Sequence, residues 1–176
     1  MILPDILAPG LRVVFCGSAV GNESFRRKAY YAHPQNRFWC TLRELGLTPI
    51  RLQPTEYERV KEWGIGLTDL AKHVHGGDAK LKRSNYEPEQ LHEKIERDQP
   101  LALAFTGKKP ASVYLAKMHG LREVRYGKHA VRIGRTAIFV LPSPSPAARR
   151  YWDIRPWRAL ARFVRDTPPV TGDRLT

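Results

Sequence analysis

Residues 11–17 read LRVVFCG, a short run of mostly apolar and β-branched side chains that ends at a glycine. Such a run predicts a buried strand that leads into a turn. Three later runs have the same character: GIGLTDL at 64–70, LALAFT at 101–106 and TAIFVL at 136–141. Helical patterns separate the four runs, so we expect an α/β fold with a central, mostly parallel four-stranded sheet.

The connecting segments differ in pattern. Helices are expected in the segments that show apolar spacing or a charged face: 37–45, 54–62, 87–98, the stretch before His119, and 151–164. Residues 17–35 are expected to be mostly irregular, and a loop of that length in a compact domain is usually functional. Residues 71–85 are basic without an apolar period, which predicts a surface loop.

A chain of 176 residues predicts one domain, expected here at 1–165 and followed by a flexible tail at 166–176. Two cysteines exclude a disulfide scaffold, and no Cys/His spacing indicates a metal site. The N-terminal residues lack the basic and apolar regions of a secretory signal, and no apolar run could span a membrane. We therefore expect a cytoplasmic protein, associated with the nucleoid if the source is bacterial.

The net charge of +13 arises from 30 Lys+Arg against 17 Asp+Glu and suggests a polyanionic partner. The charge is segregated: residues 107–135 hold eight Lys/Arg and one acid, and residues 142–165 hold six Arg and one acid. Such clustering is typical of a nucleic-acid-binding surface. The alternative is a solvated basic face that binds no nucleic acid.

In a parallel sheet, ligands bind beyond the carboxyl ends of the strands. Four segments follow the predicted strands: 17–31, 68–72, 107–109 and 142–150. We expect these segments to converge on one cleft. They carry the candidate site residues of the chain.

The candidates for holding a base and doing chemistry are few. Backbone N–H groups near Gly17 and Ser18 can stabilise a developing anion, and Tyr31 offers a ring for stacking. Asn36 has a donor and an acceptor suited to a base edge, and Asp69 is the one carboxylate at a predicted strand end. Each has a structural alternative: Asn36 and Asp69 as caps, and Tyr31 as a core residue.

A second group suits the contacts that a phosphate backbone needs. Ser143 and Ser145 lie in a proline-rich loop and could donate to phosphate oxygens, and Lys108, Arg149 and Arg150 add positive charge. The serines could instead be ordinary turn residues.

Five motifs together resemble a known family: DILAPGLRVVFCG at 5–17, AHPQNRFW at 32–39, GLTDL at 66–70, GK at 107–108 and VLPSPSP at 140–146. They resemble the mismatch-specific uracil-DNA glycosylases within the uracil-DNA glycosylase superfamily, from about Asp5 to Arg165. The resemblance implies a three-layer α/β/α sandwich, nucleotide flipping, and cleavage of a base–sugar bond without a metal or other cofactor.

The sequence departs from that branch at three positions. Ala19 stands where the branch has the Asn that positions water, Ser143 stands at the second-motif Asn, and Ala147 stands at the intercalating Leu. The first motif, GSAVG, also resembles the hypoxanthine-DNA glycosylase branch, which relies on the position of Asn36. Some mismatch-specific relatives instead use the position of Asp69.

The resemblance implies a monofunctional uracil-DNA glycosylase that acts as a monomer on DNA containing uracil or other deaminated bases. Asp69 could activate water while Asn36 orients it or reads the base, or the two roles could be reversed; Glu23 is a third candidate. With Ala19 in the first motif, the alternative is a protein that binds uracil or abasic DNA with weak or no excision. A module that binds RNA is a third reading, although the aromatic strand motif of such modules is absent from the sequence.

Overall fold

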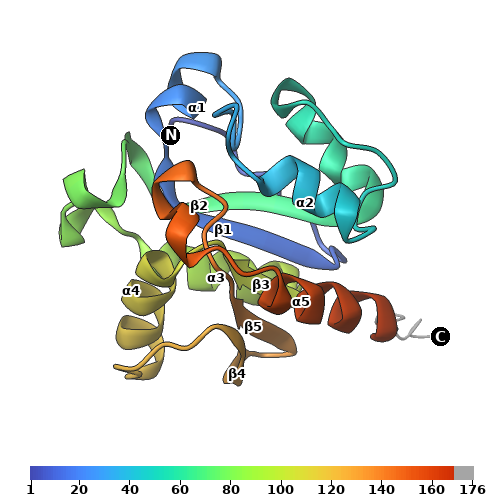
Figure 1. Cartoon of the computed structure of the whole chain (residues 1–176). Coiled ribbons are helices and arrows are strands. Elements are labelled where there is room, and N and C mark those ends of the chain that lie inside the picture. Colours follow the sequence, from blue (N-terminus) through green and yellow to red (C-terminus); the bar gives the residue numbers. More distant parts are fainter. Residues whose placement is uncertain (169–176) are drawn as a thin grey trace.

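A computed structural model describes residues 1–168 of the chain. Its five-stranded sheet has the order β2 (Ile65–His75), β1 (Val13–Val20), β3 (Ala102–Phe105), β5 (Thr136–Val140) and β4 (Gly127–Ile133). The first four strands run parallel, and β4 is antiparallel to β5 (Figure 1). The α/β class and the mostly parallel sheet are confirmed, whereas the expected number of four strands is wrong.

The additional strand, β4, has a sequence that lacks the continuous apolar run of the other four strands. GKHAVRI alternates exposed and less exposed positions, and Lys128 and Arg132 are both exposed. Because β4 lies at the edge of the sheet, it needs no continuous apolar run, and charged side chains protect such an edge from pairing with another chain. The strand pattern was therefore concealed by the basic composition of residues 107–135.

Helices form a layer on each face of the sheet. The elements on one face are α1 (Asn22–Arg27), α2 (Phe38–Glu44), the 3₁₀ helix η1 (Pro54–Trp63) and α5 (Arg155–Asp166). Those on the other are α3 (Pro88–Asp98) and α4 (Lys108–His119), which lie below β1 in the view of Figure 1. Short 3₁₀ helices complete the chain: η2 (Asp78–Lys80), η3 (Arg83–Asn85) and η4 (Pro146–Tyr151). The architecture is thus the expected three-layer sandwich.

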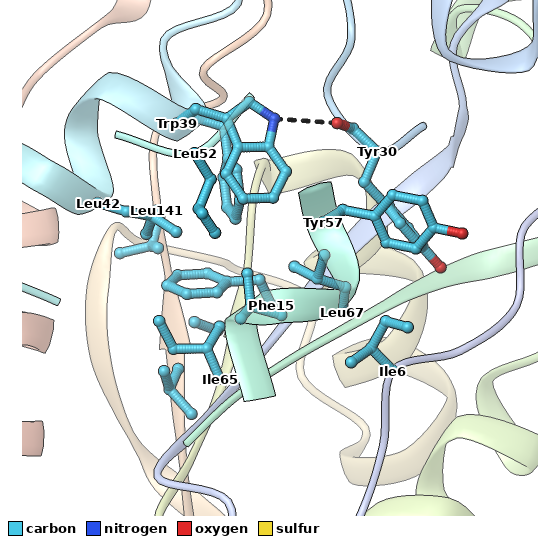
Figure 2. Close-up of a cluster of buried hydrophobic side chains, with 14 of the residues drawn as sticks. Ile6, Phe15, Tyr30, Trp39, Leu42, Leu52, Tyr57, Ile65, Leu67 and Leu141 are labelled. Atoms are coloured by element: carbon cyan, nitrogen blue, oxygen red, sulfur yellow. Dashed lines mark hydrogen bonds between the residues drawn. The ribbon is translucent and has the colours of Figure 1, made fainter. Parts of the chain in front are cut away.

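Alternating side chains of the strands divide the core in two. Phe15 and Leu67 face the α1/α2/α5 layer together with Trp39, Tyr57 and Leu141, as Figure 2 shows. The indole of Trp39 donates a hydrogen bond of 3.0 Å to the carbonyl of Tyr30, so the polar atom of this buried ring is satisfied. The neighbouring residues on β1, Val14 and Cys16, face the α3/α4 layer.

Three predicted boundaries are corrected. Residues 17–20 belong to β1, and α1 follows them, so 17–35 is not mostly irregular. β2 continues to His75, which removes the first residues of the predicted surface loop at 71–85 and buries Lys72. Helix α5 includes Asp166, the first residue of the expected tail, and residues 169–176 of that tail lie outside the described part of the chain.

Across residues 1–168, no helix combines the length and the apolar character that crossing a bilayer requires.

Gly66 in β2 is required by the close approach of the N-terminal segment. Ile6 pairs with Leu67, and a Cβ on Gly66 would lie 2.6 Å from the Ile6 carbonyl oxygen and 3.0 Å from Val14 Cγ2. Because the first of these contacts is with backbone, it cannot be relieved by a rotamer change.

We predict that Gly66→Ala lowers the free energy of unfolding by about 1–3 kcal/mol, as overpacking of a core does. Gly77→Ala is the matched control, since a Cβ there meets nothing within 4 Å and φ is −75°. Urea unfolding measures both variants. Equal stability of the two would contradict the described approach of the N-terminal segment.

Candidate active site

The hydrophobic sheet face that carries Phe15 and Leu67 ends in polar groups. Gly17 pairs with Asp69 across β1 and β2, two residues beyond Phe15 and Leu67. Thr106 directly follows β3, and its N–H donates a 2.9 Å hydrogen bond to the Cys16 carbonyl. Since side chains alternate along a strand, the positions of Gly17 and Asp69 share the face of Phe15 and Leu67.

The missing side chain of Gly17 leaves room for three polar groups. A Cβ there would lie 3.1 Å from Asp69 Oδ1, 3.6 Å from Tyr31 Oη and 3.7 Å from Thr106 Oγ1. Tyr31, Asp69 and Gly17 therefore meet at one point, as expected for segments that follow parallel strands. Thr106 is a fourth member, which the sequence did not single out.

Tyr31 is both a packing residue and a half-exposed one. Its ring stacks on Phe38 with centroids 3.8 Å apart and planes 17° apart, and its hydroxyl lies 3.0 Å from Thr106 Oγ1. The backbone at Tyr31 has φ of 51°, a left-handed conformation that is uncommon for a bulky residue. Strain of this kind is tolerated where the surroundings fix the residue, and it is concentrated at functional sites.

Asp69 is a buried carboxylate that lacks full hydrogen bonding. Its side chain is about 5 % exposed, and Oδ2 has no hydrogen-bond partner within residues 1–168. Burial raises its pKa, Lys72 opposes that shift and the nearby Asp5 adds to it, and the resulting pKa is about 6. A buried polar atom without a partner is rare and calls for an explanation, and a bound water or substrate is one.

A buried lysine lies next to the Asp69 carboxylate. Lys72 is 4 % exposed, and its Nζ lies 3.6 Å from Asp69 Oδ2, 2.8 Å from Asp5 Oδ1 and 3.2 Å from the Tyr30 hydroxyl. Asp5 also accepts hydrogen bonds from Lys94 and Thr68, each at 2.7 Å. The sequence prediction missed this network, because Lys72 stood in an expected surface loop and its partner Asp5 is distant in the chain.

Asn36 lies two residues before α2 and is not its N-cap, which is Arg37, but it does bind the first N–H of the helix. Its Oδ1 accepts a 2.9 Å hydrogen bond from the N–H of Phe38, and the side chain is half-buried. The next residue, Arg37, donates its N–H to the Pro144 carbonyl at 3.0 Å. That bond ties the Asn36 turn to the fourth predicted segment, 142–150.

The two serines of that segment behave as turn residues. Ser143 Oγ accepts from the Ser145 N–H at 3.2 Å, and Ser145 Oγ accepts from the Ala147 N–H at 3.3 Å and so caps η4. A Cβ on Gly107 would lie 3.7 Å from Ser143 Cβ, which places the 107–109 segment beside them. Their hydroxyl protons are not used in these bonds and can still donate to phosphate. The remaining predicted DNA contacts are exposed at this edge: Lys108, Ala147, Arg149 and Arg150.

Residues 17–20 of the predicted glycine turn at 17–21 belong to β1, so the turn is not an open loop of free N–H groups. Along a strand, residues two apart direct their N–H and C=O groups to the same side. Because the Cys16 carbonyl bonds Thr106, the N–H of Ser18 points to the same side, just past the last residue of β3. Of the two predicted donors, only the Ser18 N–H thus points toward the side of β3.

Glu23 is unsuited to the role of a base. It forms ion pairs with Arg26 and Arg27 on α1, and these hydrogen bonds lower its pKa to about 2. Within residues 1–168, no group of three or more His, Cys, Asp and Glu side chains is arranged to hold a metal ion.

Two surface cavities of about 430 and 470 Å³ lie away from this cluster. One is lined by Arg12, Trp63 and Val164 and the other by Pro4, Phe25 and Tyr57, and neither is lined by Tyr31, Asn36 or Asp69. Neither cavity therefore belongs to the polar cluster, whose carboxylate is itself almost wholly buried.

The sequence profile of the Uracil DNA glycosylase superfamily matches residues 4–164. The chain belongs to this superfamily. A solution NMR structure of a protein from Methanosarcina acetivorans, proposed to be a uracil DNA glycosylase, is similar with a TM-score of 0.61 and 23% identity, over 93% of this chain and 95% of that one. That similarity supports the fold, and superfamily membership supports a DNA glycosylase.

Asp69→Asn is predicted to stabilise the protein increasingly as the pH rises. The folded-state pKa of Asp69 is raised from 3.8 to about 6, so its contribution to stability is complete below pH 4 and is lost as the pH rises through 6. The amide variant has no such loss. Thermal unfolding at pH 4.5 and 7.5 measures the difference, and a variant-to-wild-type gap that is the same at both pH values would contradict the burial of an ionised Asp69.

Proposed function

We propose that this protein is a monofunctional glycosylase that flips uracil, and other deaminated bases, out of DNA and hydrolyses the N-glycosidic bond to leave an abasic site. The observation that carries the proposal is the buried Asp69 carboxylate, whose Oδ2 has no hydrogen-bond partner among residues 1–168 and whose pKa is raised to about 6. General bases are most effective when their pKa lies near the working pH. We further propose that it acts as a monomer in the cytoplasm.

In this mechanism Asp69 activates water. As the base–sugar bond breaks, its electron pair leaves with the base, and the sugar becomes an oxocarbenium-like cation. The water oxygen then adds to C1′ while Asp69 takes up a water proton, and the departing base is protonated by solvent. The negative charge of Asp69 also stabilises the sugar cation, an effect that is strong because the site is buried.

The base is held on three sides. Tyr31 is proposed to stack on the flipped base with its half-exposed ring, supported from behind by Phe38. The Ser18 N–H would donate to a uracil carbonyl oxygen as that oxygen gains charge. Asn36 would read the base edge through the amide hydrogens that its bond to the Phe38 N–H leaves free.

The DNA backbone would lie across the 107–109 and 142–150 segments. Ser143 and Ser145 can donate their hydroxyl protons to phosphate oxygens, and Lys108, Arg149 and Arg150 are exposed cations. Ala147 is exposed on η4 and carries only a methyl group into this interface.

One observation favours a second candidate function. Ala19, on β1, has no polar group with which to orient water, so excision depends on Asp69 and Asn36 alone. If these two residues do not suffice, the protein binds uracil or abasic DNA without cutting it. Treatment of a reacted uracil-containing strand with hot alkali separates the two functions: strand cleavage indicates a glycosylase, whereas a gel shift without cleavage indicates a binding protein.

We predict that Asp69→Asn lowers the single-turnover rate of uracil excision by about 10²–10⁴-fold, the usual contribution of a general base. Asn36→Ala should lower it less if the residue only reads the base. Asp166→Asn, an exposed acid at the end of α5, is the control and should retain the full rate. Full activity of both Asp69→Asn and Asn36→Ala would show that the assignment is wrong.

A further inference from the structure

Two tyrosines are exposed at the carboxyl edge of the sheet. Tyr151, at the end of η4, is 61 % exposed, and Tyr126, directly before β4, is 38 % exposed. Partial burial raises the pKa of Tyr126, and the Tyr151 phenol adds to the shift. Large aromatic side chains are seldom left exposed in neighbouring positions without a binding role.

These tyrosines lie next to the proposed DNA-binding segments. Gly127, which follows Tyr126, pairs with Val140, and Val140 leads directly into the 141–143 segment. The Lys108 ammonium lies 4.5 Å from the centroid of the Tyr126 ring. Lys108 itself begins α4 beside Ser143, so the tyrosines and the candidate phosphate contacts share one edge.

The surroundings of the two rings are strongly basic. The Arg150 guanidinium lies 5.9 Å from the Tyr151 ring centroid, and Arg149 is exposed beside it. The nearest acid along the chain from Tyr151, Asp153, is occupied by an ion pair of 2.8 Å with Arg155. We call Lys108, Tyr126, Arg150 and Tyr151 the tyrosine–cation surface.

We propose that the tyrosine–cation surface binds unpaired DNA bases by stacking, so that the protein prefers uracil in single-stranded or locally unpaired DNA. This inference rests on the proposed function for the identity of the target base. Exposed aromatic rings flanked by Lys and Arg are the features that bind single strands, because every base has a face on which a ring can stack. In a duplex those faces are covered by neighbouring base pairs.

The small side chain of Ala147 supports the same preference for unpaired DNA. Flipping a nucleotide out of a duplex costs a few kcal/mol, and the cost is least for a base that is already unpaired. A methyl group on η4 has little surface with which to fill the vacancy left in a duplex. The single strand needs no such filling, and its neighbouring bases can lie on Tyr126 and Tyr151.

The test uses fluorescence anisotropy with a 12-nucleotide DNA strand that contains no uracil, alone and as a duplex. Tyr151→Ala should weaken binding of the single strand about tenfold and change duplex binding less than twofold. Tyr151→Phe, which keeps the ring, should bind as the wild type does. Ile50→Ala, which removes an exposed apolar side chain elsewhere, is the control.

Salt dependence separates stacking from phosphate contact. Loss of a stacking ring leaves the slope of log affinity against log salt unchanged, whereas Lys108→Ala should reduce it by about 0.7 if that residue neutralises a phosphate. Single-strand binding that is unchanged in both Tyr151→Ala and Tyr126→Ala would overturn the inference. So would a loss confined to the duplex, which would mean that Tyr151 inserts between paired bases.

Because the probe lacks uracil, this result is independent of excision. Wild-type protein that binds the single strand through Tyr151 but never produces alkali-labile sites would disprove the proposed function and leave the stacking surface intact. Normal excision together with unchanged single-strand binding by both tyrosine variants would disprove the stacking surface and leave the proposed function intact.

Discussion

The carboxylate of Asp69 is held at the end of a hydrophobic sheet face, where removal from water makes its negative charge costly. Lys72 offsets that cost from 3.6 Å away, but it is shared with Asp5, which lies closer at 2.8 Å. The compensation is therefore incomplete, and the pKa of Asp69 remains raised. Full pairing would stabilise the ionised form of Asp69 and make the carboxylate a weaker base. The partial pairing therefore fits the role of general base proposed for this residue.

The fold supplies this environment through its parallel strands. On this face of the sheet, the position after Phe15 on β1 is Gly17, which has no side chain, and the position after Leu67 on β2 is Asp69, which carries a carboxylate. Tyr31, whose hydroxyl lies at this point, stacks on the buried Phe38, and Asp69 is itself almost wholly buried. Burial of this kind strengthens the electrostatic interactions within a site.

The sequence predicted those features that a local pattern determines. The four apolar runs identified the parallel strands because burial on both faces demands such runs, and the rule for carboxyl ends brought Gly17, Tyr31 and Asp69 together. The edge strand β4 was missed because one exposed face permits Lys128 and Arg132. Lys72 was misread as a surface residue because its burial depends on Asp5, a partner that no local pattern connects to it.

The most direct test of the central claim is the pH dependence of uracil excision under single-turnover conditions. The account predicts that the rate of the wild-type protein rises tenfold per pH unit at low pH and levels off near pH 6, as Asp69 loses its proton. The Asp69→Asn variant should show a slow rate without this inflection. A wild-type profile that is flat from pH 4.5 to 8, or an inflection that persists in the variant, would contradict Asp69 as the group that activates water.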